Sequence, residues 1–423
     1  MIQSLFSSEH WTAPNVIVTA LIAGAFALTP CGLFRVLPNV SYGDVLFVTA
    51  GLCTLPLLAQ RPGMAKIPLT FLLAALVFCI TGLLSYIENN VVLNLIFLSR
   101  FLIASILMPM LIAYALGFSD KAVTLAATAW VIGATFSASV ALLNHQGYWL
   151  FGLLDERVYV TGRYSGLTSF PNILAVNCVF ATVFLFYAIA NPRMPQWVRV
   201  LALAATVVNL YAIHLTGSRT SIVALFAGLG FAVLTWPSGR TRLRLIAGMG
   251  VSAILIIGFL TTRDCAPTPP NFDCSNAWER LFGKSDVSSQ ESDAMRYLLT
   301  EDAYRRFWQS PLLGSGYEHI RIAHNIYLQV LVSGGIVGFA GFLLYLGWIG
   351  VLYLRLRLSY AKVGKSLWQV NALAACVVVW LVSGLAQPFT LERNCYVAVG
   401  LLLALYLHRN TLQTDTRAMP LPA

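Results

Sequence analysis

Long runs of apolar residues recur along the chain, and each has about the length of a membrane-spanning helix. A helix needs roughly 20 apolar residues to cross a bilayer, because its backbone polar groups must all be paired internally there. Such runs lie at about 14–30, 42–60, 67–86, 91–116, 122–143, 172–190, 198–214, 220–236, 243–261, 323–354, 367–387 and 395–408. The pattern therefore predicts an all-α polytopic membrane protein with about twelve transmembrane helices.

The composition excludes a water-soluble globular protein. Hydrophobic residues make up 58% of the 423 positions and charged residues only 10%, whereas soluble domains carry about 25% charged residues. A disordered chain, an ordinary nucleic-acid-binding domain and a small disulfide scaffold are excluded as well. Residues 1–14 contain neither a basic start nor an A-x-A cleavage site, so we expect no removable signal peptide.

The segments between the apolar runs predict the organisation of the chain. Residues 1–261 hold the first nine expected spans, residues 323–408 the last three, and residues 409–423 form a tail. A large loop at 262–322 precedes the tenth span and contains an amphipathic helix at about 292–309. Fourteen of the 27 Lys and Arg residues lie in the tail and in the alternate set of short loops that faces away from this loop. Because basic loops stay in the cytoplasm, we expect both termini there and the large loop outside.

The connection between the seventh and eighth spans is a candidate anion site. It reads LTGSRTS from Leu215 to Ser221, and Gly217 supplies the backbone freedom for a sharp reversal. Ser218 or Thr220 can cap the next helix. Arg219 then stands beside the N–H groups of a helix N-terminus, which suits a phosphate or pyrophosphate. The alternative is an interfacial arginine that reaches towards lipid headgroups.

The end of the large loop offers further arginines. The amphipathic helix carries Arg296, Arg305 and Arg306, and a Gly-rich turn follows it at 313–317. The helix could lie on the membrane surface with its arginines facing a phosphorylated ligand. Alternatively, Arg305 and Arg306 only pair with acidic residues of the same helix.

A histidine stands at the head of the tenth span. His324 is followed by Asn325, a candidate supporting residue, and then by Gly335 and Gly338. Imidazole accepts a proton near neutral pH without a large pKa shift. Glycines allow helices to approach closely, which would fix the histidine in place. The alternative is a histidine with a purely structural role at the membrane interface.

Three other charged residues are candidate supporting groups. Arg100 lies nine residues into the fourth span, where a charge is costly and usually faces a partner or a wet cavity. Arg163 precedes the sixth span in a stretch that could re-enter the outer leaflet and reach the same cavity. Glu392 lies in the last short outer loop beside Arg393, and a surface ion pair between the two is the alternative.

Two of the eight cysteines differ from the rest. Cys265 and Cys274 lie in the large loop as CAPTPPNFDC, where an oxidising compartment would allow a disulfide that staples a local turn. The other six lie in or beside apolar runs, where a thiol is a small apolar side chain. The sequence contains no P-loop, no H-E-x-x-H, no G-x-S-x-G and no D-x-D pair, so we expect neither a metal nor a cofactor.

Four stretches, in order, resemble the O-antigen ligase and O-antigen polymerase superfamily of bacterial envelope glycosyltransferases. They are GRYSGLTSFPN from Gly162, LTGSRTSIVALFAGL from Leu215, MRYLLTEDAYRRFWQSPLLGSGY from Met295 and HNIYLQVLVSGGIVG from His324. The last fits the pattern H-[N/S/Q]-x9-G-x-x-[G/T/Y] that is associated with the ligases. Twelve spans and a large periplasmic loop before the tenth or eleventh also agree with this superfamily.

The resemblance implies a function. An O-antigen ligase transfers O-antigen polysaccharide from undecaprenyl pyrophosphate to lipid A–core at the periplasmic face of the Gram-negative inner membrane, without a metal and with inversion of the anomeric centre. By the same resemblance, Arg219 and Arg296 bind the pyrophosphate, Arg163 assists them, and His324 is the general base for the acceptor hydroxyl.

Other functions remain open at this point. A polymerase of the same fold would join repeat units on the lipid carrier, and the histidine pattern favours the ligase over it. A transporter of lipid-linked saccharides would place charged groups near the midplane between related halves. Ligation of sugar to a protein such as a pilin is a further alternative.

Overall fold

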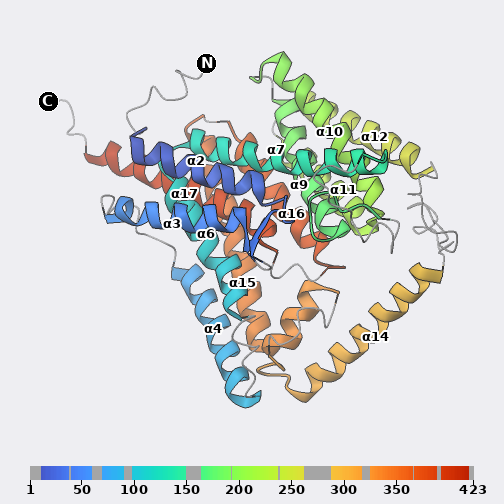
Figure 1. Ribbon diagram of the computed structural model, residues 1–423. Coiled ribbons are helices and arrows are strands. Elements are labelled where there is room, and N and C mark those ends of the chain that lie inside the picture. Colours follow the sequence, from blue (N-terminus) through green and yellow to red (C-terminus); the bar gives the residue numbers. More distant parts are fainter. Residues whose placement is uncertain are drawn as a thin grey trace.

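The computed structural model describes residues 11–37, 40–59, 69–89, 98–148, 163–191, 193–236, 239–261, 287–316, 324–364, 366–387 and 392–418. Nearly all of these residues are helical, and the helices pack into one bundle from which α4, α14 and part of α15 project at one end (Figure 1). The helices are α2 (Ala13–Leu28), α3 (Tyr42–Ala59), α4 (Leu69–Asn89), the helix Leu98–Leu116 with its π-helical turn η2 (Ile103–Leu107) and α6 (Met108–Leu116), α7 (Asp120–His145), α9 (Pro171–Ala190), α10 (Gln196–Thr216), α11 (Arg219–Thr235), α12 (Gly239–Thr261), α14 (Val287–Gln309), α15 (Ile326–Lys362), α16 (Trp368–Ser383) and α17 (Arg393–Ala418).

The helices agree with an all-α membrane protein. Over its described residues, each apolar run is helical, the run 323–354 with a break, and α14 lies in the large loop. Among the described residues, five helices are long and apolar enough to cross a membrane: Leu98–Leu116, α7, α9, α10 and α15. Four shorter apolar helices accompany them. The number of spans, about twelve, remains a prediction.

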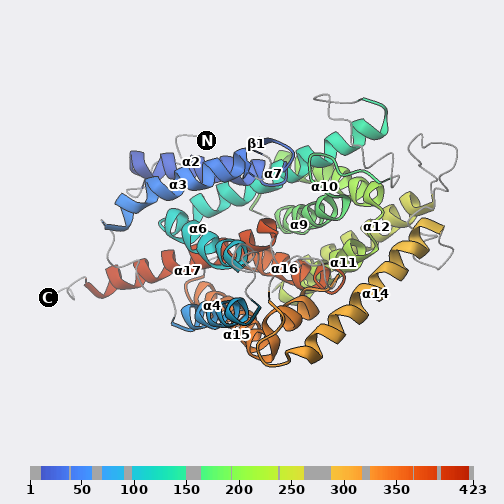
Figure 2. The same ribbon diagram turned by 60° about the horizontal axis from the view of Figure 1, so that its bottom comes forward.

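Helix α9 forms the centre of the bundle. Its side chains are apolar on every face and almost all are buried, as expected for a helix that is surrounded by others. Figure 2 shows α7, α10, α11 and α16 around it. Gly228 of α11 allows close packing here, because a Cβ atom at this position would lie 2.6 Å from a methyl group of Val379 and 2.9 Å from one of Val183.

A short β hairpin joins α2 to α3, which the hydropathy pattern does not predict. Strands β1 (Arg35–Leu37) and β2 (Val40–Ser41) are antiparallel, and Arg35 is opposite Ser41. The segment before β1 is tied to the loop that precedes α9, since the Leu33 N–H donates to the Leu167 carbonyl at 2.9 Å. The hairpin and this loop therefore lie together at one end of the bundle.

The two ends of the bundle can be told apart by their polar contacts. At one end, the Tyr360 hydroxyl of α15 donates to Asp120 of α7 at 2.7 Å, and His408 of α17 lies 3.7 Å from the same carboxylate. The start of α7 thus meets the last turns of α15 and the later part of α17. The first residues of α15 and α17, and the last residues of α7, must lie towards the opposite end.

Candidate functional site

Arg163 connects the loop before α9 to the turn between α10 and α11. Its Nε donates to the Thr216 carbonyl at 2.5 Å, and its Nη2 donates to Asn172 Oδ1 at 2.6 Å. The next backbone N–H, that of Tyr164, donates to the Leu215 carbonyl at 3.2 Å. Arg163 therefore lies directly beside the turn that leads to Arg219, 56 residues later in the chain.

The turn itself places Arg219 at a helix N-terminus. Gly217 adopts a left-handed conformation, with φ 60° and ψ 24°, and α11 begins at Arg219. Ser218 is the N-cap residue, but its hydroxyl pairs with the Ser221 hydroxyl at 2.9 Å and does not cap the backbone. Ser218 thus occupies the expected N-cap position without the expected side-chain bond, and Thr220 lies inside the helix. The half-buried Arg219 side chain adds a full positive charge to the positive end of the helix dipole.

The start of α11 lies at the C-terminal end of α16. Asn371, near the start of α16, donates to the Thr235 carbonyl at the end of α11 at 3.3 Å. Gly228 of α11 meets Val379 further along. The two helices are therefore antiparallel, and Arg219 must stand near the level where α16 ends.

The start of α15 meets the same end of α16. The Ile326 N–H donates to the Gly384 carbonyl at 2.7 Å, and the Tyr327 hydroxyl donates to the Leu381 carbonyl at 2.9 Å. His324 directly precedes this helix and is half-buried. His324 and Arg219 thus both lie at the C-terminal end of α16.

Asn325 has a clear structural task. Its Oδ1 accepts hydrogen bonds from the N–H groups of Tyr327 at 2.9 Å and Leu328 at 3.2 Å. It is therefore the N-cap of α15 and holds the backbone directly after His324 in an extended conformation. An amide or hydroxyl side chain next to the histidine suits this role.

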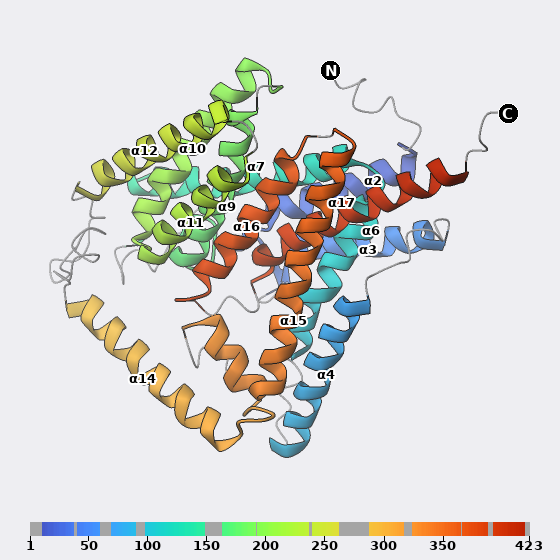
Figure 3. The ribbon, with the colours of Figure 1, turned by 180° about the vertical axis from the view of Figure 1, so that it is seen from behind.

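Gly335 breaks α15 into two helices. Its φ of 61° and ψ of −165° are not helical, and only glycine adopts this conformation readily. Figure 3 shows the first part of α15 as a short helix that meets the long part at an angle. The expectation that Gly335 serves close helix packing is therefore wrong in its detail, because this glycine ends one helix and begins another.

The Gly-rich turn after α14 fills this break. The N–H groups of Ser315 and Gly316 donate to the carbonyls of Val332 and Ser333 at 2.8 and 3.1 Å. In return, Ile336 and Val337 donate to the carbonyls of Pro311 and Leu312 at 2.9 and 3.3 Å. These four bonds satisfy backbone groups that a helix break would otherwise leave exposed. They fix the end of α14 to the helix that begins after His324.

Arg296 lies on the face of α14 that is turned towards α15. Ala303 and Phe307 of α14 pack against Leu328 and Val332 of the short first part of α15. Arg296 precedes Ala303 by seven residues, which is two helical turns, so it is on the same face roughly 10 Å further along. Its side chain is half-buried, in contrast to the exposed neighbouring residues.

The other two arginines of α14 pair with an acidic residue of the same helix, as the alternative interpretation predicted. Arg305 and Arg306 bind the two oxygens of Asp302 at 2.5 and 2.8 Å. These guanidinium groups hold the pKa of the Asp302 carboxyl below its usual range. Arg305 is also 74% exposed, so Arg296 is the one arginine of this helix that remains a candidate ligand-binding residue.

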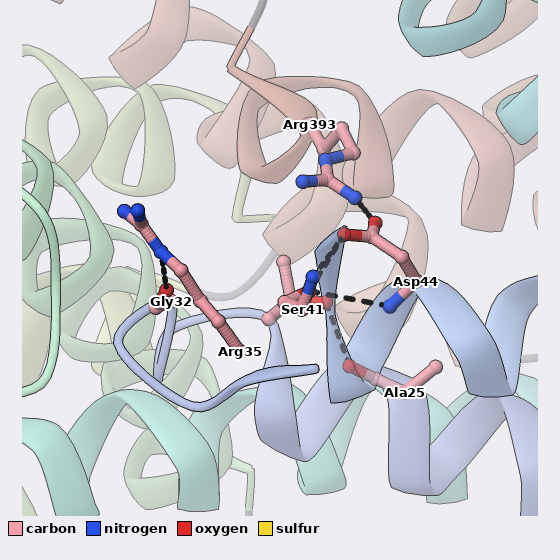
Figure 4. Close-up of polar contacts among 7 residues, drawn as sticks. Ala25, Gly32, Arg35, Ser41, Asp44 and Arg393 are labelled. Atoms are coloured by element: carbon pink, nitrogen blue, oxygen red, sulfur yellow. Dashed lines mark hydrogen bonds and ion pairs between the residues drawn. The ribbon is translucent and has the colours of Figure 1, made fainter. Parts of the chain in front are cut away.

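Glu392 lines a polar pocket of about 180 Å³. Burial raises the pKa of its carboxyl to about 7. The expected ion pair with Arg393 is not the one formed, because the Arg393 guanidinium pairs with Asp44 of α3 (Figure 4). Arg35 also lines this pocket. Sequence reasoning missed it, although it stands in a short outer loop of a set that carries few basic residues.

Three expected residues take no part in the contacts described above. The side chain of Arg100 is exposed near the start of the helix Leu98–Leu116, and its supporting role remains a prediction. Cys265 and Cys274 lie outside the described residues. Among the cysteines of the described part, Cys31, Cys53, Cys178, Cys376 and Cys395 are free thiols.

Comparisons with known proteins agree with the motifs. Residues 204–343 match a family model described as O-antigen ligase, and this range contains Arg219, Arg296 and His324. The curated O-antigen ligase of Pseudomonas aeruginosa is 27% identical over 278 residues. The similarity covers 63% of this chain and 57% of that relative. The chain therefore matches only a little over half of the relative's length.

Proposed function

We propose that this chain, a member of the O-antigen ligase superfamily, is a membrane glycosyltransferase and acts as an O-antigen ligase. It transfers O-antigen polysaccharide from undecaprenyl pyrophosphate to the lipid A–core oligosaccharide in lipopolysaccharide biosynthesis. In this proposal the protein is a multi-pass protein of the Gram-negative inner membrane. Both termini are cytoplasmic and the reaction takes place at the periplasmic face, which the distribution of basic loops supports.

The main support for the proposal is that α11 and α15 both begin near the C-terminal end of α16. Arg219 begins α11 and His324 precedes α15, and both lie at the C-terminal end of α16. A cationic group for a departing pyrophosphate and a base for an attacking hydroxyl are thus available from one direction. This is the side opposite to the contact between Asp120 and Tyr360.

The arginines act on the donor. The bond between the anomeric carbon and the pyrophosphate oxygen breaks, and its electron pair stays with the pyrophosphate. Fixed guanidinium groups stabilise this growing negative charge most strongly in the transition state. Arg219 makes the main contact, and Arg296 approaches from α14. Arg163 holds the turn of Arg219 through Thr216 and adds positive charge beside it.

The histidine acts on the acceptor. The acceptor hydroxyl oxygen forms the new bond to the anomeric carbon, and its proton passes to the His324 imidazole. Attack from the side opposite the pyrophosphate inverts the anomeric centre. General-base assistance of this kind is worth about 10²–10⁴-fold in rate. The N-cap Asn325 and the contact of Ile326 with Gly384 hold the histidine relative to α16.

Reconstitution of the purified protein tests the proposal. The protein is placed in vesicles with undecaprenyl-pyrophosphate-linked glycan and lipid A–core, in the presence of a chelator. We expect transfer to lipid A–core without added metal. Arg305→Ala is a matched control, since Arg305 is exposed and paired within α14, and it should transfer at the wild-type rate.

The choice of acceptor separates the two functions of the superfamily. If the protein extends a second carrier-linked glycan and leaves lipid A–core unmodified, it is a polymerase and the ligase proposal is wrong. If a chelator abolishes transfer and a divalent cation restores it, the metal-independent mechanism is wrong.

A further inference from the structure

A second polar site lies beside the first one. The pocket of about 180 Å³ is formed where the β hairpin, the loop before α9, the start of α9 and the start of α17 meet. At the density of liquid water it holds roughly six water molecules, which is room for one sugar ring. Its walls carry hydroxyl, amide, carboxyl and guanidinium groups from Ser41, Ser169, Asn394, Glu392, Arg35 and Arg393.

The hairpin and the loop hold Arg35 at one wall. Its Nε donates to the Gly32 carbonyl at 3.2 Å, and its Nη2 donates to the Ser169 hydroxyl at 3.2 Å. Ser169 belongs to the same loop as Arg163. The position of this guanidinium is thus set by two separate segments, while the side chain as a whole stays exposed to incoming molecules.

An ion pair fixes a second part of the pocket wall. Arg393 at the start of α17 pairs with Asp44, and the other Asp44 oxygen accepts from the Ser41 N–H and hydroxyl, both at 2.8 Å. Figure 4 shows Ser41 between the Arg35 and Arg393 side chains. Arg35 is opposite Ser41 in the hairpin, and Ser41 is linked to Arg393 through Asp44. The two arginines that line the pocket are therefore connected through the hairpin.

The charges of the lining favour an anion while the Glu392 carboxyl is protonated. Arg35 and Arg393 each contribute a positive charge, and Asp44 offsets that of Arg393. Burial raises the pKa of the Glu392 carboxyl to about 7, so this group is largely protonated in mildly acidic solution and then donates a hydrogen bond. The many hydroxyl and amide groups are partners that sugars use.

A chain of contacts through Arg163 connects the pocket to the proposed reaction site. Ile173 lines it and directly follows Asn172, the residue that binds Arg163. Arg163 in turn binds the carbonyl of Thr216, three residues before Arg219. A substrate whose reacting end lies at Arg219 would therefore bring a neighbouring sugar towards this pocket.

From this geometry we propose that the pocket is a separate saccharide subsite, and that it binds a sugar carrying a phosphate or carboxylate group. Arg35 binds the anionic group, and Ser41, Ser169 and Asn394 bind sugar hydroxyls. The inference rests on the proposed function in that the sugar belongs to one of the two glycolipid substrates. The binding chemistry itself does not require turnover.

A binding measurement tests the subsite without catalysis. The full chain in detergent micelles is titrated with glucosamine 6-phosphate, and with glucosamine and inorganic phosphate as separate probes. We expect the sugar phosphate to bind most tightly. Arg35→Gln should weaken its binding about ten- to hundredfold, as expected for loss of a charge-assisted hydrogen bond. Ser169→Ala should weaken it less, and Arg35→Lys should restore part of it.

Two controls show whether weaker binding in Arg35→Gln results from the loss of this guanidinium group. Arg305→Gln removes an exposed arginine elsewhere and should bind as the wild type does. The thermal unfolding midpoint of Arg35→Gln should lie close to that of the wild type, because the bonds that Arg35 makes to Gly32 and Ser169 are solvent-exposed. The assignment is overturned if inorganic phosphate binds as well as the sugar phosphate, or if Arg35→Gln binds the sugar phosphate unchanged.

Kinetics identify which substrate supplies the sugar. In the reconstituted reaction, Arg35→Gln should raise the KM of one glycolipid about tenfold or more and leave kcat and the other KM nearly unchanged. A rise for lipid A–core assigns the sugar to the acceptor, and a rise for the carrier-linked glycan assigns it to the donor. If the wild type binds the sugar phosphate through Arg35 but transfers nothing, the proposed function fails while the subsite stands. If transfer occurs and neither KM changes, the subsite assignment fails alone.

Discussion

Arg163 Nε donates a hydrogen bond of 2.5 Å to the Thr216 carbonyl, and this contact ties the loop before α9 to the turn from which Arg219 begins α11. Nη2 of the same guanidinium group donates to Asn172 Oδ1 at 2.6 Å. Because two of its nitrogens hold neighbouring segments, we expect Arg163 to act mainly as a positioning residue for Arg219.

Because Arg163 binds two acceptors at once, we expect that another positively charged side chain cannot replace it. A lysine carries one ammonium group on a flexible chain and cannot span both acceptors. Arg163→Lys and Arg163→Ala should therefore both lower kcat by about tenfold or more, on the scale of two charge-assisted hydrogen bonds. Asn172→Ala should have a smaller effect. Steady-state kinetics of the reconstituted protein check this, and wild-type kcat in Arg163→Lys would contradict the positioning role.

The break in α15 predicts strong effects of small glycine substitutions. A Cβ atom at Gly335 would lie 2.2 Å from the Leu312 oxygen, and one at Gly314 would lie 2.4 Å from the Ser333 oxygen. Gly335→Ala should therefore cost more than about 1–3 kcal/mol of stability, since backbone strain adds to the clash. Thermal unfolding in detergent measures this cost.

Gly347→Ala is the matched control for that experiment. Gly347 lies in the long part of α15, and a Cβ atom there meets open space. Alanine is the better helix former, so this variant should be as stable as the wild type or slightly more stable. Equal unfolding midpoints for Gly335→Ala and Gly347→Ala would show that the break is not required.

The N-cap predicts which substitutions of Asn325 are tolerated. Asn325→Ala removes the acceptor for two N–H groups and should cost about 1 kcal/mol, with a several-fold loss of kcat through misplacement of His324. Asn325→Ser keeps a capping oxygen and should transfer nearly as well as the wild type. Measurement of kcat and KM for both variants checks this. A normal kcat in Asn325→Ala together with a low one in Asn325→Ser would point to an amide contact with substrate.

The Glu392 carboxyl predicts a stability that depends on pH. Burial raises its pKa from 4.5 to about 7 in the folded protein, so folding favours the protonated form. The contribution of Glu392 to stability is therefore full at low pH and is lost as the pH rises from about 4.5 to about 7. Arg35 and Arg393 line the same pocket.

Glu392→Gln removes that dependence, because glutamine stays neutral. The variant and the wild type should have similar unfolding midpoints at pH 5, and the variant should be the more stable one at pH 8.5. Thermal unfolding of both proteins at the two pH values measures the difference. A wild type that is more stable than the variant at pH 8.5 would mean that the ionised carboxylate is the favoured form.

The sequence predicts the helices better than their contacts. Apolar runs of about 20 residues are local signals, and they agree with the helices from α2 to α17. The position of Arg219 at a helix start also follows from local turn chemistry at Gly217. The face of α14 that packs against α15 does not follow from hydropathy, because Met295, Leu298 and Trp308 are exposed.

Contacts between distant segments could not be predicted in this way. Arg163 and Thr216 are 53 residues apart, and nothing local identifies a backbone carbonyl as the partner. Arg393 stands next to Glu392 in the chain but pairs with Asp44, because α3 and α17 meet only in the folded bundle. Gly335 lies within a continuous apolar run, and its break becomes favourable only because residues 311–316 supply the missing hydrogen bonds.

The most direct test of the central claim is a double-mutant cycle on Arg219 and His324 in single-turnover transfer. If the guanidinium and the imidazole serve the same transition state, Arg219→Ala and His324→Ala should each slow transfer about a hundredfold or more. The double variant should then be little slower than the worse single variant, because groups that act as a unit are not additive. Transfer at the wild-type rate in either single variant, or two losses that simply multiply, would contradict a shared site.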